Sequence, residues 1–155
     1  MKGNIVLELG IMLVLIIVVA VALFAGSVLQ QSFLTKTAGK LADQSPIVES
    51  GYALDAIANG FLFLVVGLFA AAFIAAFIVG EHPVFAFITI ILLYVMTIIT
   101  AAFSNFFQSF ASKTVFAYQV GQFNIVVTIM TNLPVIFFVL GSVLIIVLYA
   151  KGGVK

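Results

Sequence analysis

The chain has 155 residues, of which 65% are hydrophobic and only 7% are charged, and its formal net charge is +1. Soluble domains carry roughly 25% charged residues, so this composition excludes a water-soluble globule and makes lipid the solvent for most of the chain. The basic residues are six scattered lysines, which excludes a nucleic-acid-binding surface and a polybasic segment for anionic lipid heads. Cysteine is absent, and with it disulfides, thiolate metal ligands and cysteine nucleophiles.

Four apolar stretches are each long enough to cross a bilayer, which takes about 20 apolar residues in a helix. The predicted spans cover 8–30, 56–80, 83–104 and 129–150. The first stretch is longer than the apolar core of an ordinary signal peptide, so we expect it to remain as a signal-anchor helix. The sequence therefore predicts a single membrane domain over 1–155. Its fold class is an all-α, polytopic integral membrane protein with four long antiparallel transmembrane helices.

Short polar segments predict tight hairpin turns between consecutive helices, at 43–46, 80–82 and 112–114. Ser45 followed by Pro46 is typical of a helix start, with serine as the N-cap and proline in the first turn. Turns this short make consecutive helices antiparallel neighbours. Polar and aromatic residues mix around the first and third turns, so we expect the helices to extend past the bilayer on that side.

An even number of crossings would place the N- and C-termini on the same side of the membrane. Three lysines lie on that side and three lie on the side of the first and third turns, so the positive-inside rule does not fix the direction of insertion. The terminal lysines lie closest to the ends of the spans, which favours cytoplasmic termini.

Two adjoining stripes of small residues run along the second span. Small residues at every fourth position let helix backbones approach closely, and van der Waals contact then stabilises the pair in lipid. We expect these residues to pack within the chain's own bundle, with self-association between copies as the alternative. One stripe contains Gly67, Ala71 and Ala75, and the other contains Ala72, Ala76 and Gly80.

A proline interrupts the fourth apolar stretch. Pro134 has no N–H to donate and its ring clashes with the preceding turn, so it predicts a kink. Asn132 stands two residues before it and could cap a restarted helix. We expect a structural kink satisfied by neighbouring side chains, and the alternative is a hinge or a broken-helix ion site.

Charged and polar residues form no recognisable reactive centre. The carboxylates Glu8, Asp55 and Glu81 lie at the ends of predicted spans, whereas functional charges usually lie deep in the membrane. His82 is the only histidine, and without cysteine it cannot complete a zinc, copper or bis-histidine haem site. No Gly-x-Ser-x-Gly, P-loop or dinucleotide-binding glycine motif occurs. We therefore expect no catalytic residue, metal, cofactor or small-molecule substrate, and no enzyme activity.

Aromatic residues gather on the parts of the third and fourth helices that are predicted to extend past the bilayer. If their rings are not buried within the monomer, they form an apolar patch larger than a single protein usually leaves exposed. Such patches contact partners or lipid headgroups. The candidate partner contacts are Phe106, Phe107, Phe110, Phe116 and Tyr118.

These features predict a non-catalytic structural or accessory membrane protein that packs laterally in a larger membrane-embedded assembly. Its partners would be the lipid bilayer and either further copies of the chain or other membrane proteins, as in a multisubunit complex or a virion membrane. The alternative is a small channel, pore or transporter, including a holin-like one. That alternative depends on Glu8 near a span and on Asn132 with Pro134.

Overall fold

A computed structural model describes residues 5–38, 40, 45–78 and 86–150. Within these residues every regular element is helical, which confirms the predicted all-α class. Four helices are long and apolar enough to cross a membrane, as expected for a polytopic membrane protein. The elements are α1 (Ile5–Thr37), α2 (Ser45–Ile78), α3 (Ala86–Ala111), the 3-10 helix η2 (Thr114–Phe116), α4 (Ala117–Gln122), α5 (Asn124–Thr131) and α6 (Leu133–Ala150).

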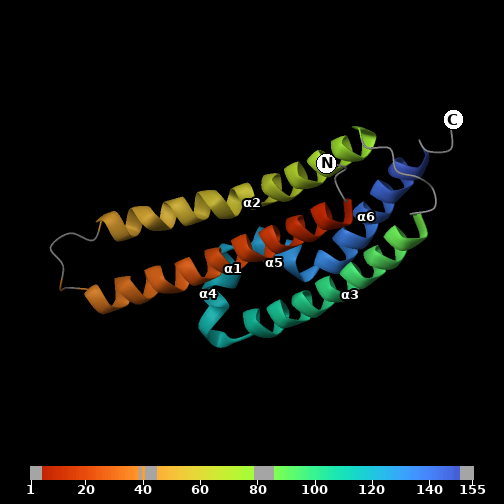
Figure 1. Ribbon diagram of the computed structural model, residues 1–155. Coiled ribbons are helices and arrows are strands. Elements are labelled where there is room, and N and C mark those ends of the chain that lie inside the picture. The colour runs from red at the N-terminus through yellow and green to blue at the C-terminus, as the bar shows by residue number, and fades with distance from the viewer. Residues whose placement is uncertain (1–4, 39, 41–44, 79–85, 151–155) are drawn as a thin grey trace.

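The long helices form two antiparallel pairs (Figure 1). Helices α1 and α2 pack along each other, and α3 packs against α6. The short helices α4 and α5 lie between the pairs, where both contact α1 and α5 also contacts α2. Because α1 starts and α6 ends at the same end of the bundle, the chain crosses the bundle an even number of times.

The long helices differ in length, and α1 and α2 are much longer than the hydrocarbon core of a bilayer is thick. The 33 residues of α1 and the 34 of α2 reach about 50 Å at ~1.5 Å per residue, whereas the hydrocarbon core is ~30 Å thick. The 18 residues of α6 reach about 27 Å and match that core. The extra length of α1 and α2 lies at one end, where they reach beyond α4 (Figure 1).

One of the three predicted turns lies within the described residues. At 112–114 the N–H of Lys113 donates to the carbonyl of Phe110 at 3.2 Å, and its own carbonyl accepts from Phe116 at 2.9 Å. The turn at 80–82, and with it Gly80, Glu81 and His82, lies outside the described residues, as does most of 43–46.

The segment after Lys113 is not the single kinked helix that the sequence suggested. It breaks twice, at Phe123 with backbone angles φ −106° and ψ 44°, and at Asn132 with φ −101° and ψ 9°. The first break turns Phe123 inward, where it is 1% exposed and its ring lies 5.8 Å from that of Phe24. Burial of this ring between α1 and α5 is the feature that periodicity did not indicate.

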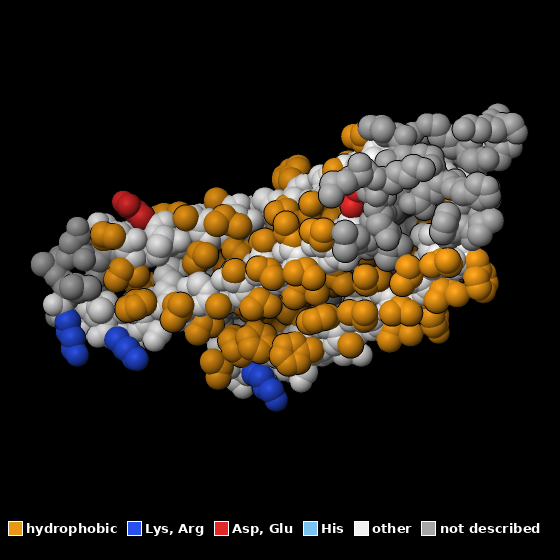
Figure 2. All heavy atoms as spheres, in the orientation of Figure 1, with side chains coloured by type: hydrophobic (Ala, Val, Ile, Leu, Met, Phe, Trp, Pro, Cys, Tyr) orange, Lys and Arg blue, Asp and Glu red, His pale blue; other side chains and the backbone are white. Residues whose placement is uncertain are grey.

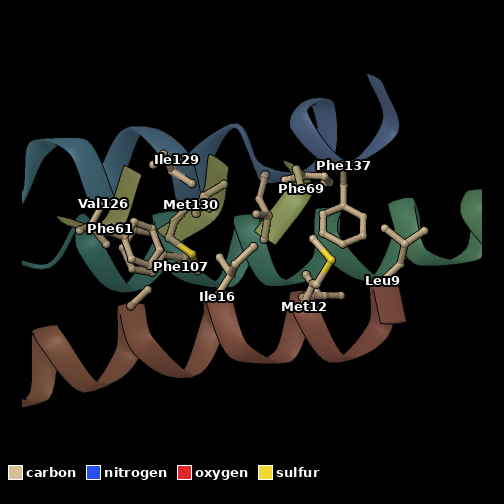
Figure 3. Close-up of a cluster of buried hydrophobic side chains, with 14 of the residues drawn as sticks. Leu9, Met12, Ile16, Phe61, Phe69, Phe107, Val126, Ile129, Met130 and Phe137 are labelled. Atoms are coloured by element: carbon tan, nitrogen blue, oxygen red, sulfur yellow. The ribbon is translucent and has the colours of Figure 1, made fainter. Parts of the chain in front are cut away.

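The centre of the bundle is filled by large apolar side chains. Figure 3 shows Ile16 of α1 facing Phe61 of α2 and Met130 of α5, and all three are at most 1% exposed. Phe24 makes edge-to-face contacts with Phe107 at 5.2 Å between ring centroids, which joins α1 to α3. Helices in lipid gain no hydrophobic drive toward one another, so close contacts of this kind hold the bundle together.

Glycine sets the helix spacing at two places. Gln30 of α1 donates to the carbonyl of Ile47 in α2 at 3.0 Å, and a Cβ at Gly51 would collide with the Gln30 amide. In the second pair, a Cβ at Gly141 of α6 would collide with Leu93 of α3. At both places the glycine leaves room for a side chain of the neighbouring helix.

The outer surface is apolar (Figure 2). Phe63, Phe87 and Phe106 are 77%, 71% and 70% exposed, a degree of exposure that suits hydrocarbon and not water. In the face shown in Figure 2, two basic side chains lie at one end and a third lies near the middle of the lower edge.

Cysteine labelling tests the number of crossings, because the chain has no cysteine of its own. In sealed vesicles, a membrane-impermeant maleimide is expected to label Lys36→Cys and Lys113→Cys from one face and Ala150→Cys from the other. All three residues are exposed in the structure. Labelling of Lys113→Cys and Ala150→Cys from the same face would contradict the four-span topology.

Candidate functional site

Polar side chains meet where α4 approaches α1 and α2. Gln122 of α4 donates through Nε2 to Oδ1 of Asp55 in α2, and its Oε1 accepts from Ser27 of α1 at 3.3 Å. One turn earlier, Nε2 of Gln119 donates to Oε1 of Gln31 in α1 at 3.0 Å. These five residues, here named the glutamine cluster, link three helices by side-chain hydrogen bonds.

Gln119 is the most buried glutamine of the glutamine cluster. It is 1% exposed, and within the described part of the chain its Oε1 has no hydrogen-bond donor. An unpaired buried acceptor costs about 1–3 kcal/mol. Because this oxygen is itself buried, it is a local cost to stability and not an open ligand position.

The glutamine cluster offers little chemistry by itself. Among the described residues no group of three histidine, cysteine or acidic side chains lies close enough to hold a metal ion. Glu8 is half-buried near the start of α1, about 28 Å along that helix from Ser27 at ~1.5 Å per residue. The structure therefore does not bring Glu8 and Asp55 together.

One carbonyl at the break before Pro134 is bound by a neighbouring helix. Helix α5 ends at Thr131 and α6 starts at Leu133, so Pro134 lies in the first turn of α6, where its missing N–H is tolerated. The Thr131 carbonyl accepts from Oγ of Ser104 in α3 at 2.8 Å. Asn132 turns back on α5 and donates to the Thr128 carbonyl at 2.8 Å.

The two small-residue stripes of α2 have different surroundings. Ala72 and Ala76 are 6% and 1% exposed and lie in the core. Gly67 and Ala71 are exposed, and a Cβ added at Gly67 would meet nothing within 4 Å. Ala75 is half-buried at the boundary between the two environments. Among the described residues of the two stripes, Ala72 and Ala76 are therefore the two that are buried inside the monomer.

The five aromatic candidates for partner contact are also divided. Phe107 is 4% exposed and packs on Phe24, so it lies inside the bundle. Phe110 and Phe116 are half-buried and stack at 3.9 Å between ring centroids. Phe106 and Tyr118 are 70% and 59% exposed. Of the five rings, those of Phe106 and Tyr118 are therefore the two that are exposed on the outer surface.

Two apolar hollows lie along α1 and α3. The first, the α1–α3 groove, has a volume of about 1030 Å³ and runs between Gly10 and Val18 of α1 and Met96 and Phe103 of α3. The second, the aromatic pocket, has a volume of about 600 Å³ and is walled by α1, α3, η2 and α5. It shares Ile17 and Phe103 with the groove and exposes no polar lining surface.

Sequence reasoning missed the glutamine cluster and both hollows. In the sequence, Gln119 and Gln122 are only polar members of an amphipathic segment. Their spacing of three residues places them on one helix face, but it does not indicate which helices that face meets. The hollows depend on how far α1 and α3 diverge, for which the sequence offers no signal.

Substitution of Ser104 tests how the helix break is satisfied. Ser104→Ala is expected to lower the free energy of unfolding by about 1 kcal/mol, because the Thr131 carbonyl loses its best donor. Ser109→Ala, an exposed serine on the same helix, is the control and should have no effect. The measurement is unfolding by SDS in mixed micelles. Equal stability of both variants would show that the break does not depend on this bond.

The two partners in the Gln31–Gln119 bond should respond in opposite ways. Gln31→Leu leaves the Gln119 amide wholly unpaired and should destabilise the fold by about 1–3 kcal/mol. Gln119→Leu removes the orphaned oxygen and should be neutral or stabilising, since the half-exposed Gln31 can turn to water. Circular dichroism during thermal unfolding in detergent measures both. A larger loss for Gln119→Leu would contradict the pairing described.

No family model matches the chain, and neither a curated protein nor a solved structure is similar to it at a significant level. A fold hosts many functions, so the helical architecture alone assigns none.

Proposed function

We propose that the chain is a non-catalytic subunit that packs laterally against other proteins in a membrane-embedded assembly. The outward face of α2 carries this proposal. Gly60 and Gly67 lie on it, and a Cβ added at either glycine would meet no neighbour within 4 Å. Ala71 continues the stripe and is exposed.

Glycine in this place is unfavourable for the isolated chain. Each glycine within a helix costs about 1 kcal/mol relative to alanine, and at these two positions the bundle has room for a larger side chain. Gly51 and Gly141 differ, because their neighbours would collide with a Cβ. A partner helix lying against Gly60 and Gly67 would explain these glycines, because they would let the two helices approach closely. No helix of the monomer approaches them in this way.

The surroundings of this stripe suit such contact. Phe63, Val66 and Ile74 flank it and are 77%, 58% and 61% exposed. Large side chains beside small ones form a ridge and a groove, and this relief lets a second helix interlock in lipid. The proposal covers both a further copy of this chain and a different membrane protein.

The packed centre of the bundle favours this function over a channel. Ile16, Leu133 and Phe137 are 0% exposed and fill the space that a water path through one chain would need. The glutamine cluster lies among α1, α2 and α4. The buried hydroxyls of Thr100 and Ser104 in α3 donate to the backbone carbonyls of Thr97 and Thr131 and not to the glutamine cluster.

A bulky substitution on α2 tests the proposal. Gly67→Leu should fold normally, because the space is open, and it should abolish or strongly reduce higher-mass particles extracted from the native membrane. Ala102→Leu, at an exposed alanine of α3, is the matched control and should leave them intact. The measurement is native mass spectrometry against the 16.5 kDa monomer. A wild-type chain that is monomeric in lipid, or an assembly insensitive to Gly67→Leu, would overturn the proposal.

A further inference from the structure

We propose that the aromatic pocket is a lipid site that takes one acyl chain of an anionic phospholipid, with Lys113 binding the phosphate of the headgroup. This site is separate from the outward face of α2 and does not depend on the function proposed for that face. Three features of the described residues carry it: the lining, the dimensions and the charge at the rim.

The lining selects a wholly apolar occupant. The pocket exposes no polar surface, and its wall combines Phe103, Phe107 and Phe110 of α3 with Phe24 of α1 and Phe116 of η2. No hydrogen-bonding group reaches into it, so a polar ligand would lose its hydration without replacement. An acyl chain carries no such group.

The dimensions fit one leaflet. The lining residues of α1 extend from Ile17 to Leu29, about 18 Å at ~1.5 Å per residue. Half of the hydrocarbon core is about 15 Å. Four elements wall the pocket, and a volume near 600 Å³ is too small for a helix, whose diameter with side chains is about 10–12 Å. The space therefore suits a single chain from one leaflet and not a partner helix.

The charge lies at the rim of the pocket. Lys113 is exposed in the turn between Phe110 and Phe116, and both of these rings line the pocket. Backbone hydrogen bonds join Lys113 to both residues, so the turn holds its position relative to the rings. Lys113 is also the only charged residue in 86–150, and no acidic group on that stretch competes for it.

A site with a single lysine does not produce the polybasic segment by which anionic-lipid binding is usually recognised in a sequence. The chain has no polybasic cluster, and one lysine near a membrane surface contributes about 1 kcal/mol to binding of an anionic lipid. That corresponds to a preference of about fivefold over a neutral lipid of the same chain length. The pocket adds the acyl-chain contacts that fix this preference at one place.

The absence of tryptophan allows a site-specific test. Phe106→Trp places one fluorophore at the rim of the pocket, at a ring that is 70% exposed. The protein is reconstituted in mixed phosphatidylcholine and phosphatidylglycerol vesicles, with bromine on the acyl chains of one lipid at a time. Because brominated chains quench only adjacent tryptophan, the ratio of quenching by the two lipids reports which one occupies the pocket. Phe63→Trp, 77% exposed on α2, reports ordinary lipid contact.

We expect about fivefold preference for phosphatidylglycerol at Phe106→Trp and none at Phe63→Trp. Adding Lys113→Gln should reduce the preference to none, Lys113→Arg should retain it, and Lys36→Gln, at an exposed lysine of α1, should not change it. Filling the pocket with Ala25→Phe should also abolish it, whereas Ala22→Phe, at an exposed position outside the lining, should not.

Three results would overturn the proposal. Equal quenching by both lipids at Phe106→Trp would mean ordinary bilayer contact. Quenching by neither would mean that protein covers the pocket. A preference that survives both Lys113→Gln and Ala25→Phe would place the anionic lipid elsewhere.

Discussion

A backbone group that loses its helical partner in lipid must find another partner within the protein, because no water is present to replace it. The helix break at Asn132 shows this requirement most directly. The Thr131 carbonyl accepts a hydrogen bond from the Ser104 hydroxyl of α3, whereas the Thr128 carbonyl keeps the backbone N–H of Asn132 as a donor and also accepts from the Asn132 amide. The break lies directly before the fourth candidate span, Leu133–Ala150, and the bond from Ser104 joins α3 to α5 there. The proline that marks it in the sequence then occupies a position where it costs little.

The rest of the bundle is held by contact and not by exclusion of water. Three rings meet Phe24, and they join α1 to α3 and to the segment after Lys113. Glycine allows close helix approaches at Gly51 and Gly141. At Gly60 and Gly67, by contrast, nothing lies within 4 Å of an added Cβ. The contrast between these two pairs of glycines supports a partner helix on the outward face of α2. The presence of small residues alone would not.

The two proposals concern different parts of the surface and different partners. The outward face of α2 offers a shallow relief of small and large apolar residues, which suits another helix. The aromatic pocket offers a narrow, walled space beside a lysine, which suits one acyl chain and a phosphate. Neither surface requires a reactive side chain. Both proposals describe a protein that acts by packing against helices and lipids and not by catalysis.

Much of the architecture follows from the sequence alone. The length of the apolar stretches, the sparse charges, the Ser45–Pro46 start and Pro134 determine that the chain is helical, where its long helices run and where the fourth is interrupted, because hydrocarbon thickness and backbone geometry act locally. The tertiary structure decided which faces meet. Only it separates Gly67 from Ala72, buries Phe107 but exposes Phe106, and joins Gln119 and Gln122 to residues of α1 that lie 88 and 95 positions earlier in the chain. In lipid the inward and outward faces of a helix are both apolar, so hydrophobic periodicity, which separates them in a soluble protein, carries no such information here.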